Sequence, residues 1–237
     1  MPTPPRPTYA ACRVTVDRGN HKPSMTGSDH AQLTLFSVPT CVYCHRARLV
    51  LAEKDARVRI VDIDPDEPSD ELAAVSPELR VPTLVDRGAS VFGARTLVEY
   101  LDERYPYPPL LPVDPLNRAR VRMMLDYIET RAYPLAEAIE LGEGSAVRQK
   151  RELADWLTLI VADLAEQRPS GSGLSLIDTS LAPLLWRVGE FGLPLGSKSR
   201  KAGDDRWQQY AARLFERPAF YVSLSSAEAR MSPALAR

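Results

Sequence analysis

The sequence predicts an α/β domain followed by an all-α domain, and three observations lead to this prediction. Short apolar stretches of strand length alternate with helical patterns between residues 33 and 105. A proline-rich segment at 105–112 then interrupts every regular period, because proline continues neither a helix nor a central strand. Beyond residue 115 the hydrophobic spacing is helical. We therefore expect a disordered arm at 1–31, an α/β domain at 32–106, a linker at 107–114 and a helical domain at 115–237.

The first predicted strand and helix meet at a pair of cysteines. The apolar stretch 33–36 has the length of a strand, and a turn that contains Pro39 ends it. A helical period follows, whose apolar face is formed by Tyr43, Ala47, Val50 and Leu51. We expect the rest of the helix surface to carry His45, Arg46, Arg48, Glu53 and Lys54. Cys41 and Cys44 stand at the helix start, where a Cys-x-x-Cys pair is typical of a thioredoxin-like site.

The two cysteines admit two interpretations. A thiol at a helix N-terminus faces unpaired N–H groups and the positive end of the helix dipole, so its thiolate is favoured and the pair can be redox-active. In the other interpretation both thiols are reduced and inert. A structural zinc site is disfavoured, because the three cysteines and three histidines include no second pair with ligand spacing. So few cysteines form no disulfide framework, which favours a reducing, cytoplasmic location.

The remaining elements of the α/β domain complete a thioredoxin-like order. We predict strands at 58–62, 81–86 and 90–92, and helices at 71–75 and 94–105. The strand at 81–86 begins with Val81-Pro82, and the first residue of a strand is a position that tolerates proline. The resulting order is β-α-β-α-β-β-α.

The second domain is predicted from helical patterns alone. We expect helices at 115–141, 146–167, from 175 onward, at 204–216 and from 218 onward. The third of these begins at Ser175, and Asp178 three residues later makes a capping-box pattern. Trp156, Trp186 and Trp207 all fall in this half, and we interpret them as core residues rather than ligand contacts.

The composition disfavours membranes and nucleic acids as binding partners. With 44% hydrophobic and 26% charged residues the chain has the composition of a globular protein, and no apolar run reaches the length of about 20 residues that spans a membrane. Residues 33–195 carry 18 basic and 25 acidic residues, which is a poor match for phosphate backbones and disfavours direct nucleic-acid binding. The arm has many prolines and no apolar signal segment. Translation can start at Met1 or at Met25 just before the first strand.

Several longer motifs resemble a known family. A thioredoxin-like domain, a proline-rich linker and a helical domain with an internal Ser-x-x-Asp cap resemble the glutathione transferase fold. Within it, the chain is similar to the stringent starvation protein A family of proteobacteria. The motifs that carry this likeness are 45–54 (HRARLVLAEK), 81–87 (VPTLVDR), 99–106 (EYLDERYP), 108–113, 181–187 and 215–217.

The resemblance implies a function and a binding segment. It implies a homodimeric transcription regulator of the stress response that binds RNA polymerase holoenzyme or its sigma factor and lacks ordinary transferase activity. The implied contact segment is Tyr105, Pro106, Tyr107, Pro108 and Pro109. Tyr107 stands where the family has histidine, and the pair Cys41 and Cys44 looks more like that of a glutaredoxin. The segment can also be a plain hinge, with Tyr107 buried against the helical domain.

A glutathione-dependent enzyme is the alternative. In transferases the proline that matches Pro82 follows a cis peptide bond, here after Val81, and exposes backbone that pairs with glutathione. The acidic-Ser pair that holds the other end of glutathione would fall at Gly93 and Ala94, whose side chains offer no hydrogen bond. We therefore expect a non-catalytic regulator without a cofactor or metal. A glutaredoxin-like or transferase-like thiol enzyme, with glutathione as cofactor, remains the alternative.

Overall fold

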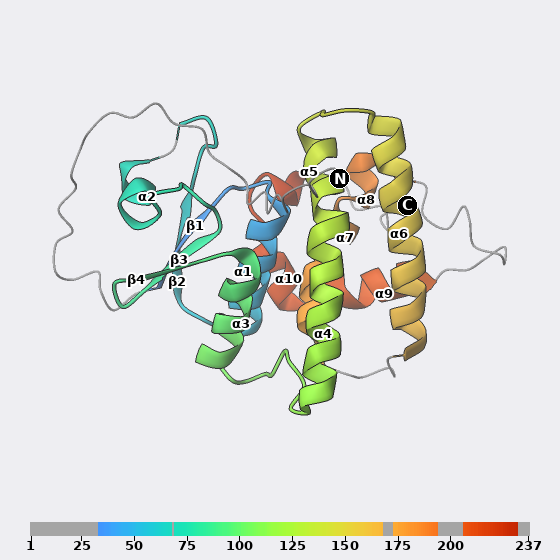
Figure 1. Ribbon diagram of the computed structural model, residues 1–237, viewed down its shortest axis with the longest axis horizontal. Coiled ribbons are helices and arrows are strands. Elements are labelled where there is room, and N and C mark those ends of the chain that lie inside the picture. The colour runs from blue at the N-terminus through green and yellow to red at the C-terminus, as the bar shows by residue number, and fades with distance from the viewer. Residues whose placement is uncertain (1–32, 68, 168–172, 194–205, 232–237) are drawn as a thin grey trace, which may run out of the picture.

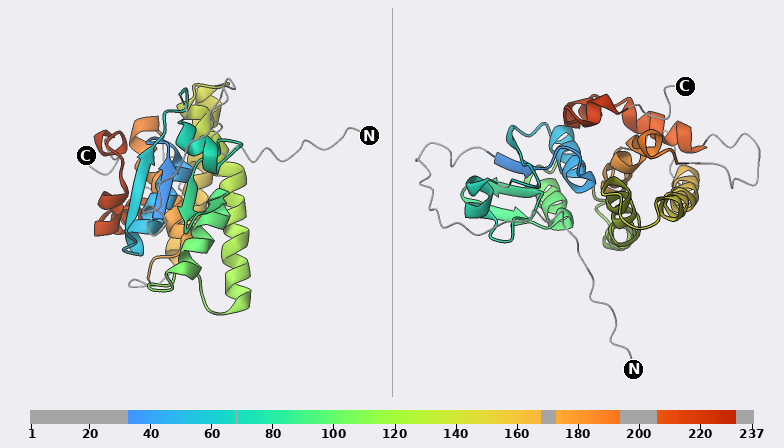
Figure 2. Two further views of the ribbon diagram at one scale, coloured as in Figure 1. Left: turned by 90° about the vertical axis from the view of Figure 1, so that its left-hand side faces the viewer. Right: turned by 90° about the horizontal axis from the view of Figure 1, so that it is seen from above.

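The structure, a computed structural model, describes residues 33–67, 69–167, 173–193 and 206–231. A small sheet with its helices lies on one side and a bundle of longer helices on the other, as Figures 1 and 2 show. This is the predicted α/β domain joined to an all-α domain. The arm predicted at 1–31 lies outside the described residues. No helix among those residues is long and apolar enough to cross a membrane.

The sheet has four strands in the order β2-β1-β3-β4. They are β1 (Leu33–Ser37), β2 (Val58–Asp62), β3 (Thr83–Asp86) and β4 (Ala89–Phe92). β2 is parallel to β1, and β3 and β4 add antiparallel neighbours on the other side. Arg87 and Gly88 join β3 to β4, both with positive φ (50° and 77°), as a two-residue hairpin turn of the right twist requires. The central position of β1 places the loop that follows it, and hence the cysteines, beside the helical domain.

Three helices accompany the sheet: α1 (Val42–Glu53), α2 (Asp70–Val75) and α3 (Ala94–Arg104). α1 lies between the sheet and the helical domain (Figure 1), where it contacts α3 as well as α7 and α10. The expectation that its charged residues form an outer surface is therefore wrong. His45, Arg46, Arg48 and Lys54 are all buried. A helix covered on every side has no solvent face, so each of these side chains needs a partner.

The helical domain departs from the prediction in its first helix. The predicted helix 115–141 is divided into α4 (Pro115–Tyr127), a π-helical turn η2 (Ile128–Ala132) and α5 (Tyr133–Glu140). Pro134 lacks the N–H that would continue the regular ladder into the preceding turn, which accounts for the wider turn there. The other elements are α6 (Ala146–Gln167), α7 (Leu176–Trp186), α8 (Val188–Phe191), α9 (Arg206–Phe215), α10 (Pro218–Ser223) and the 3-10 turn η3 (Glu228–Arg230). Neither α8 nor η3 was predicted from the sequence as a separate element.

α7 is the central helix of this domain and begins at the predicted capping box. Ser175 Oγ accepts from Asp178 N–H at 3.3 Å, and Ser175 N–H donates to Asp178 Oδ2 at 2.7 Å. Tyr210 of α9 donates to the other carboxylate oxygen of Asp178 at 2.6 Å. Trp186 is buried at the end of α7, while Trp156 and Trp207 are half-buried against the same core. The interpretation as a core residue is therefore confirmed for Trp186, whereas Trp156 and Trp207 lie at the edge of that core.

Replacing Ser175 with alanine is expected to lower the free energy of unfolding by about 1 kcal/mol. The change removes the acceptor for one N–H of the first turn of α7. The measurement is the midpoint of urea denaturation at unchanged slope. Ser90→Ala, at an exposed position of β4, is the control and should move the midpoint much less. An unchanged midpoint for Ser175→Ala would contradict the stabilising role of the cap.

Candidate functional site

The two cysteines lie at the start of α1, as predicted. Cys41 is the N-cap residue and Cys44 lies in the first turn. Both are buried, with 6% of Cys41 and none of Cys44 exposed, and no disulfide joins them. Cys44 Sγ accepts a hydrogen bond from the N–H of Val38 at 3.3 Å, and the two thiols are hydrogen-bonded to each other. The pair is therefore close together and reduced.

Burial changes the expected acidity of one thiol. Burial and the hydrogen bond with Cys41, which keeps the proton on Cys44, raise the pKa of the Cys44 thiol well above its ordinary value, and the nearby Arg48 only partly offsets this. Cys44 is thus protonated at neutral pH, although it lies at a helix N-terminus. Cys44 is therefore an exception to the rule that a helix N-terminus favours thiolate. Removing the thiolate from water is less favourable in free energy than its interaction with the helix dipole is favourable. The acidity of Cys41 stays a prediction.

The residues that the resemblance compares with the glutathione site of transferases lie before β3 and at the start of α3. Val81-Pro82 is a cis peptide bond, as the resemblance implied, and Val81 belongs to the same core cluster as Cys41 and Cys44. Ala94 packs against that cluster at the start of α3. Gly93 caps α3 with a positive φ of 87°, a conformation that favours glycine. The cis bond that the resemblance implied is thus present, and Gly93 and Ala94 offer no side-chain hydrogen bond.

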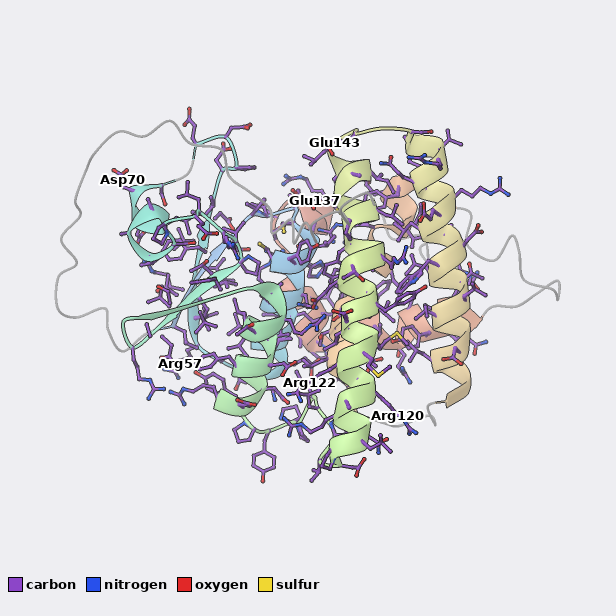
Figure 3. All side chains as sticks on the ribbon, viewed as in Figure 1. Arg57, Asp70, Arg120, Arg122, Glu137 and Glu143 are labelled. Atoms are coloured by element: carbon purple, nitrogen blue, oxygen red, sulfur yellow. The ribbon has the colours of Figure 1, made fainter. Side chains whose placement is uncertain are left out.

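Two carboxylates of α5 interact electrostatically with Cys41 and were not found from the sequence. Burial raises the pKa of Glu137 and of Glu140 to about 7, and the nearby Cys41 adds to the effect. Figure 3 shows Glu137 on the upper part of α5, beside the α/β domain. Glu140 also accepts a hydrogen bond from Arg187 Nε at 2.7 Å. Both are therefore partly protonated at neutral pH, and they give the surroundings of Cys41 an acidic character.

Two arginines and one glutamate from distant parts of the chain form a buried ion cluster. Glu228 of η3 accepts from Arg48 Nη2 of α1 at 2.6 Å and from Arg187 Nη2 after α7 at 2.7 Å. Burial alone would raise the pKa of Glu228, but the facing His45, Arg48 and Arg187 hold it well below its ordinary value. We refer to Arg48, Arg187 and Glu228 as the ion cluster.

His45 lies against this cluster without adding a charge to it. Its Nδ1 is 3.3 Å from Glu228 Oε1 and 3.2 Å from Arg187 Nη1. Burial lowers the pKa of His45 to about 4, so the imidazole is neutral at neutral pH. Its Nε2 has no hydrogen-bond partner among the residues that the structure describes.

The helical domain also holds the loop that carries Cys41. Arg187 Nη2 donates to the carbonyl oxygen of Thr40. Ser225 Oγ donates to that of Pro39 at 2.7 Å. Ser225 and Glu228 form a second capping box, because Ser225 N–H donates to the Glu228 carboxylate and Glu228 N–H donates to Ser225 Oγ. The loop between β1 and α1 is therefore fixed by side chains from the far end of the chain.

The predicted contact segment is an exposed loop, separate from the cysteines. Pro106, Tyr107, Pro108 and Pro109 are exposed, and Tyr107 has 82% of its surface in water, while Tyr105 is half-buried. The reading in which Tyr107 is buried against the helical domain is therefore wrong.

A buried ion pair fixes the shape of this segment. Lys54 Nζ at the end of α1 donates to Asp102 Oδ1 of α3 at 2.6 Å, and none of the Lys54 side chain is exposed. Asp102 also accepts from the N–H groups of Leu110 and Leu111 at 2.8 and 3.1 Å. Lys54 in turn donates to the carbonyl oxygen of Pro108. Tyr107 thus projects from a loop that is anchored on its C-terminal side.

No group of three or more His, Cys, Asp or Glu side chains in the described part of the chain is arranged to hold a metal ion.

Comparison with known proteins identifies relatives of two kinds. A family model described as the N-terminal domain of glutathione S-transferase matches residues 35–109. A stringent starvation protein A homolog from Pasteurella multocida is 40% identical over 201 residues, 81% of this chain and 90% of that protein. The homolog from Coxiella burnetii is 36% identical over 207 residues, 84% of this chain and 94% of that protein.

Solved structures support the fold. Glutathione transferase Omega 3C from Trametes versicolor superposes with a TM-score of 0.68 at 25% identity, over 82% of this chain and 85% of that one. Ure2p in complex with glutathione gives a TM-score of 0.69 at 18% identity, over 84% of this chain and all (100%) of that one. The second likeness concerns the fold alone.

Proposed function

Because the chain belongs to the stringent starvation protein A family, we propose that it is a non-catalytic regulator of transcription that binds RNA polymerase holoenzyme through the segment Tyr105–Pro109. The observation that carries the proposal is the exposure of this segment, with 82% of Tyr107 in water. A large aromatic side chain exposed to this extent has no role in the core of its own protein. It is available to a partner.

The geometry of the segment suits a binding anchor. Three prolines surround Tyr107, and the Lys54–Asp102 pair holds the residues that follow. A segment that is already ordered loses little conformational entropy on binding. Tyrosine is also one of the residue types that most often dominate binding energy at interfaces. We propose that the segment contacts the polymerase or its sigma factor in the cytoplasm. We further propose that the protein makes no direct contact with nucleic acid.

We further propose that the regulator is a homodimer. Leu116, Met123 and Tyr127 lie on one face of α4, because steps of seven and eleven residues return to nearly the same helical angle. All three are exposed, by 62%, 72% and 44%. An exposed apolar stripe along a helix favours burial against another surface. The same stripe on α4 of a second copy of the chain provides a matching apolar surface, which favours a homodimer.

We propose no bound cofactor. Gly93 and Ala94 supply no side-chain hydrogen bond to the γ-glutamyl end of glutathione, where each such bond to a charged group contributes about 1.5–3 kcal/mol. A glutaredoxin-like or transferase-like enzyme is the second candidate function, and the pair Cys41 and Cys44 at the start of α1 favours it. Retention of the protein on glutathione resin would support that candidate.

The test compares binding of purified RNA polymerase holoenzyme to the parent and to a variant with Pro106, Tyr107 and Pro108 all changed to alanine. We expect the affinity to fall by more than tenfold, because truncating a central aromatic anchor commonly costs 2 kcal/mol or more. Tyr107→His should bind like the parent, since it restores the residue of the family. The measurement is a binding titration on immobilised protein.

The matched control is Tyr221→Ala, which removes an exposed tyrosine (59%) from α10. It should leave the affinity unchanged. Circular dichroism and the mass in gel filtration should be those of the parent for every variant. Equal binding by parent and triple variant would exclude the segment as the contact. A parent that does not bind polymerase at all would exclude the proposed function.

A further inference from the structure

The two cysteines are arranged as an unequal pair, which a merely structural role does not require. Cys41 is the residue nearer to solvent, whereas Cys44 is fully enclosed, one helical turn further on. The thiols are hydrogen-bonded to each other. Residues three apart at the start of a helix have Cα atoms about 5–6 Å apart, which lies within the range that a disulfide spans. The Cα separation expected for such a pair therefore permits a disulfide.

We propose that Cys41 and Cys44 form a reversible redox pair, which low-molecular-weight disulfides oxidise to an intramolecular disulfide and to which the helical domain controls access. This inference does not depend on the proposed binding to polymerase. It gives a role to two residues that the proposed function leaves unused.

The reaction takes two exchanges. The Cys41 thiolate attacks one sulfur of a linear disulfide RSSR, so that a Cys41–S–S–R bond forms and the first RS⁻ leaves. The Cys44 sulfur then attacks the Cys41 sulfur, the mixed disulfide breaks and the second RS⁻ leaves. The protein dithiol is oxidised by two electrons, RSSR is reduced to two RSH, and the two thiol protons end on these products. The burial of Cys44 suits the second step, because an enclosed thiol reacts with its neighbour rather than with solvent.

The helical domain controls the first step through the loop before Cys41. Ser225 donates to the carbonyl oxygen of Pro39 at 2.7 Å, and Arg187 donates to that of Thr40, the residue directly before Cys41. Arg187 is held in turn by Glu228. While these bonds are made, only 6% of Cys41 is exposed, so attack on a disulfide requires the loop to open. Weakening the hold on the loop should therefore speed oxidation.

The experiment uses full-length protein with Cys12 changed to serine, so that only the pair can react. Native protein is mixed with excess 2-hydroxyethyl disulfide, quenched with an alkylating agent and analysed by mass spectrometry. We expect an intramolecular disulfide that dithiothreitol reverses. Cys44→Ser should stop at the mixed disulfide, and Cys41→Ser should stay unmodified. A native pair that remains reduced, or that reacts only in denaturant, would overturn the proposal, and so would modification of Cys41→Ser at the parent rate.

The control by the helical domain has its own matched variants. Ser225→Ala removes one hydrogen bond to the loop, and we expect oxidation about two- to tenfold faster. Ser226→Ala, at the exposed neighbouring position, should react like the parent. Ser175→Ala weakens the fold away from the loop and should also leave the rate unchanged. If Ser175→Ala accelerates oxidation as much as Ser225→Ala does, general unfolding rather than the loop controls the pair.

Discussion

Changing Glu228 to glutamine should lower the free energy of unfolding by about 3–5 kcal/mol, which is the usual cost of removing one partner from a buried ion pair. The variant keeps the size of the side chain and loses its charge. Arg48 and Arg187 would then lie almost without solvent contact, at 2.6 and 2.7 Å from a neutral group. Arg187 would keep its ion pair with Glu140 at 2.7 Å, so the uncompensated buried charge would lie mainly on Arg48.

The measurement is chemical denaturation at pH 7, with Glu190→Gln on the exposed side of α8 as control. The control should change stability by no more than about 0.5 kcal/mol. Adding Arg48→Met to Glu228→Gln removes the cation that has lost its anion and should recover part of the loss. Equal stability of Glu228→Gln and the parent would show that the ion cluster does not hold the two domains together.

The effect of Glu228 should depend on pH in one direction. Its pKa is lowered in the folded protein from the ordinary value of 4.5. A lowered carboxyl pKa contributes stability that is fully present above the unfolded pKa and is lost as the pH falls toward the folded one. The difference in stability between parent and Glu228→Gln should therefore be constant between pH 8 and about pH 5 and shrink in more acidic solution.

The parts of the fold that sequence analysis predicted well depend on local signals. The capping box at Ser175 and Asp178 lies within four residues, and the structure contains both of its hydrogen bonds. The start of α1 at the Cys-x-x-Cys pair follows from the strand, turn and helical period that surround it. These features need only the propensities of neighbouring residues.

The charged residues of α1 show what local signals miss. Arg48 is hydrogen-bonded to Glu228, which lies 180 residues away in the sequence. Arg46 is hydrogen-bonded to Glu129, which lies 83 residues away. The helical pattern alone predicts that such side chains face solvent, because it carries no information on which other elements of the fold cover the helix. One local signal did exist: Ser225 and Glu228 have the spacing of a capping box. It locates η3, although not its partners.

The exposure of Tyr107 also lay beyond the sequence. A tyrosine between prolines suits a buried hinge as well as a binding surface, since its ring is apolar and its hydroxyl polar. The exposure depends on the Lys54–Asp102 pair, whose members lie 48 residues apart in the sequence and which fixes the residues after Tyr107 through the N–H groups of Leu110 and Leu111. In the helical sequence patterns around Lys54 and Asp102, nothing distinguishes either residue from an ordinary exposed charge.

Changing Asp102 to alanine should affect both stability and binding. The carboxylate accepts from Lys54 at 2.6 Å and from the N–H groups of Leu110 and Leu111. Its loss leaves the enclosed ammonium group of Lys54 with the carbonyl oxygen of Pro108 but without an anion, and it leaves two buried N–H donors without an acceptor. We expect the free energy of unfolding to fall by about 3–5 kcal/mol. Glu103→Ala, at the exposed neighbouring position, is the control and should behave like the parent.

Binding to RNA polymerase separates the two roles of Asp102. Tyr107 itself is unchanged in Asp102→Ala, but the residues after it lose their anchor, so we expect a fall in affinity at a temperature where the variant is fully folded. Adding Lys54→Met removes the enclosed charge and should recover part of the stability. It restores no acceptor for Leu110 or Leu111, and the affinity should therefore stay low. If the double variant regains stability and affinity together, the ion pair acts only on the fold, and the shape of the Tyr107 loop does not determine binding.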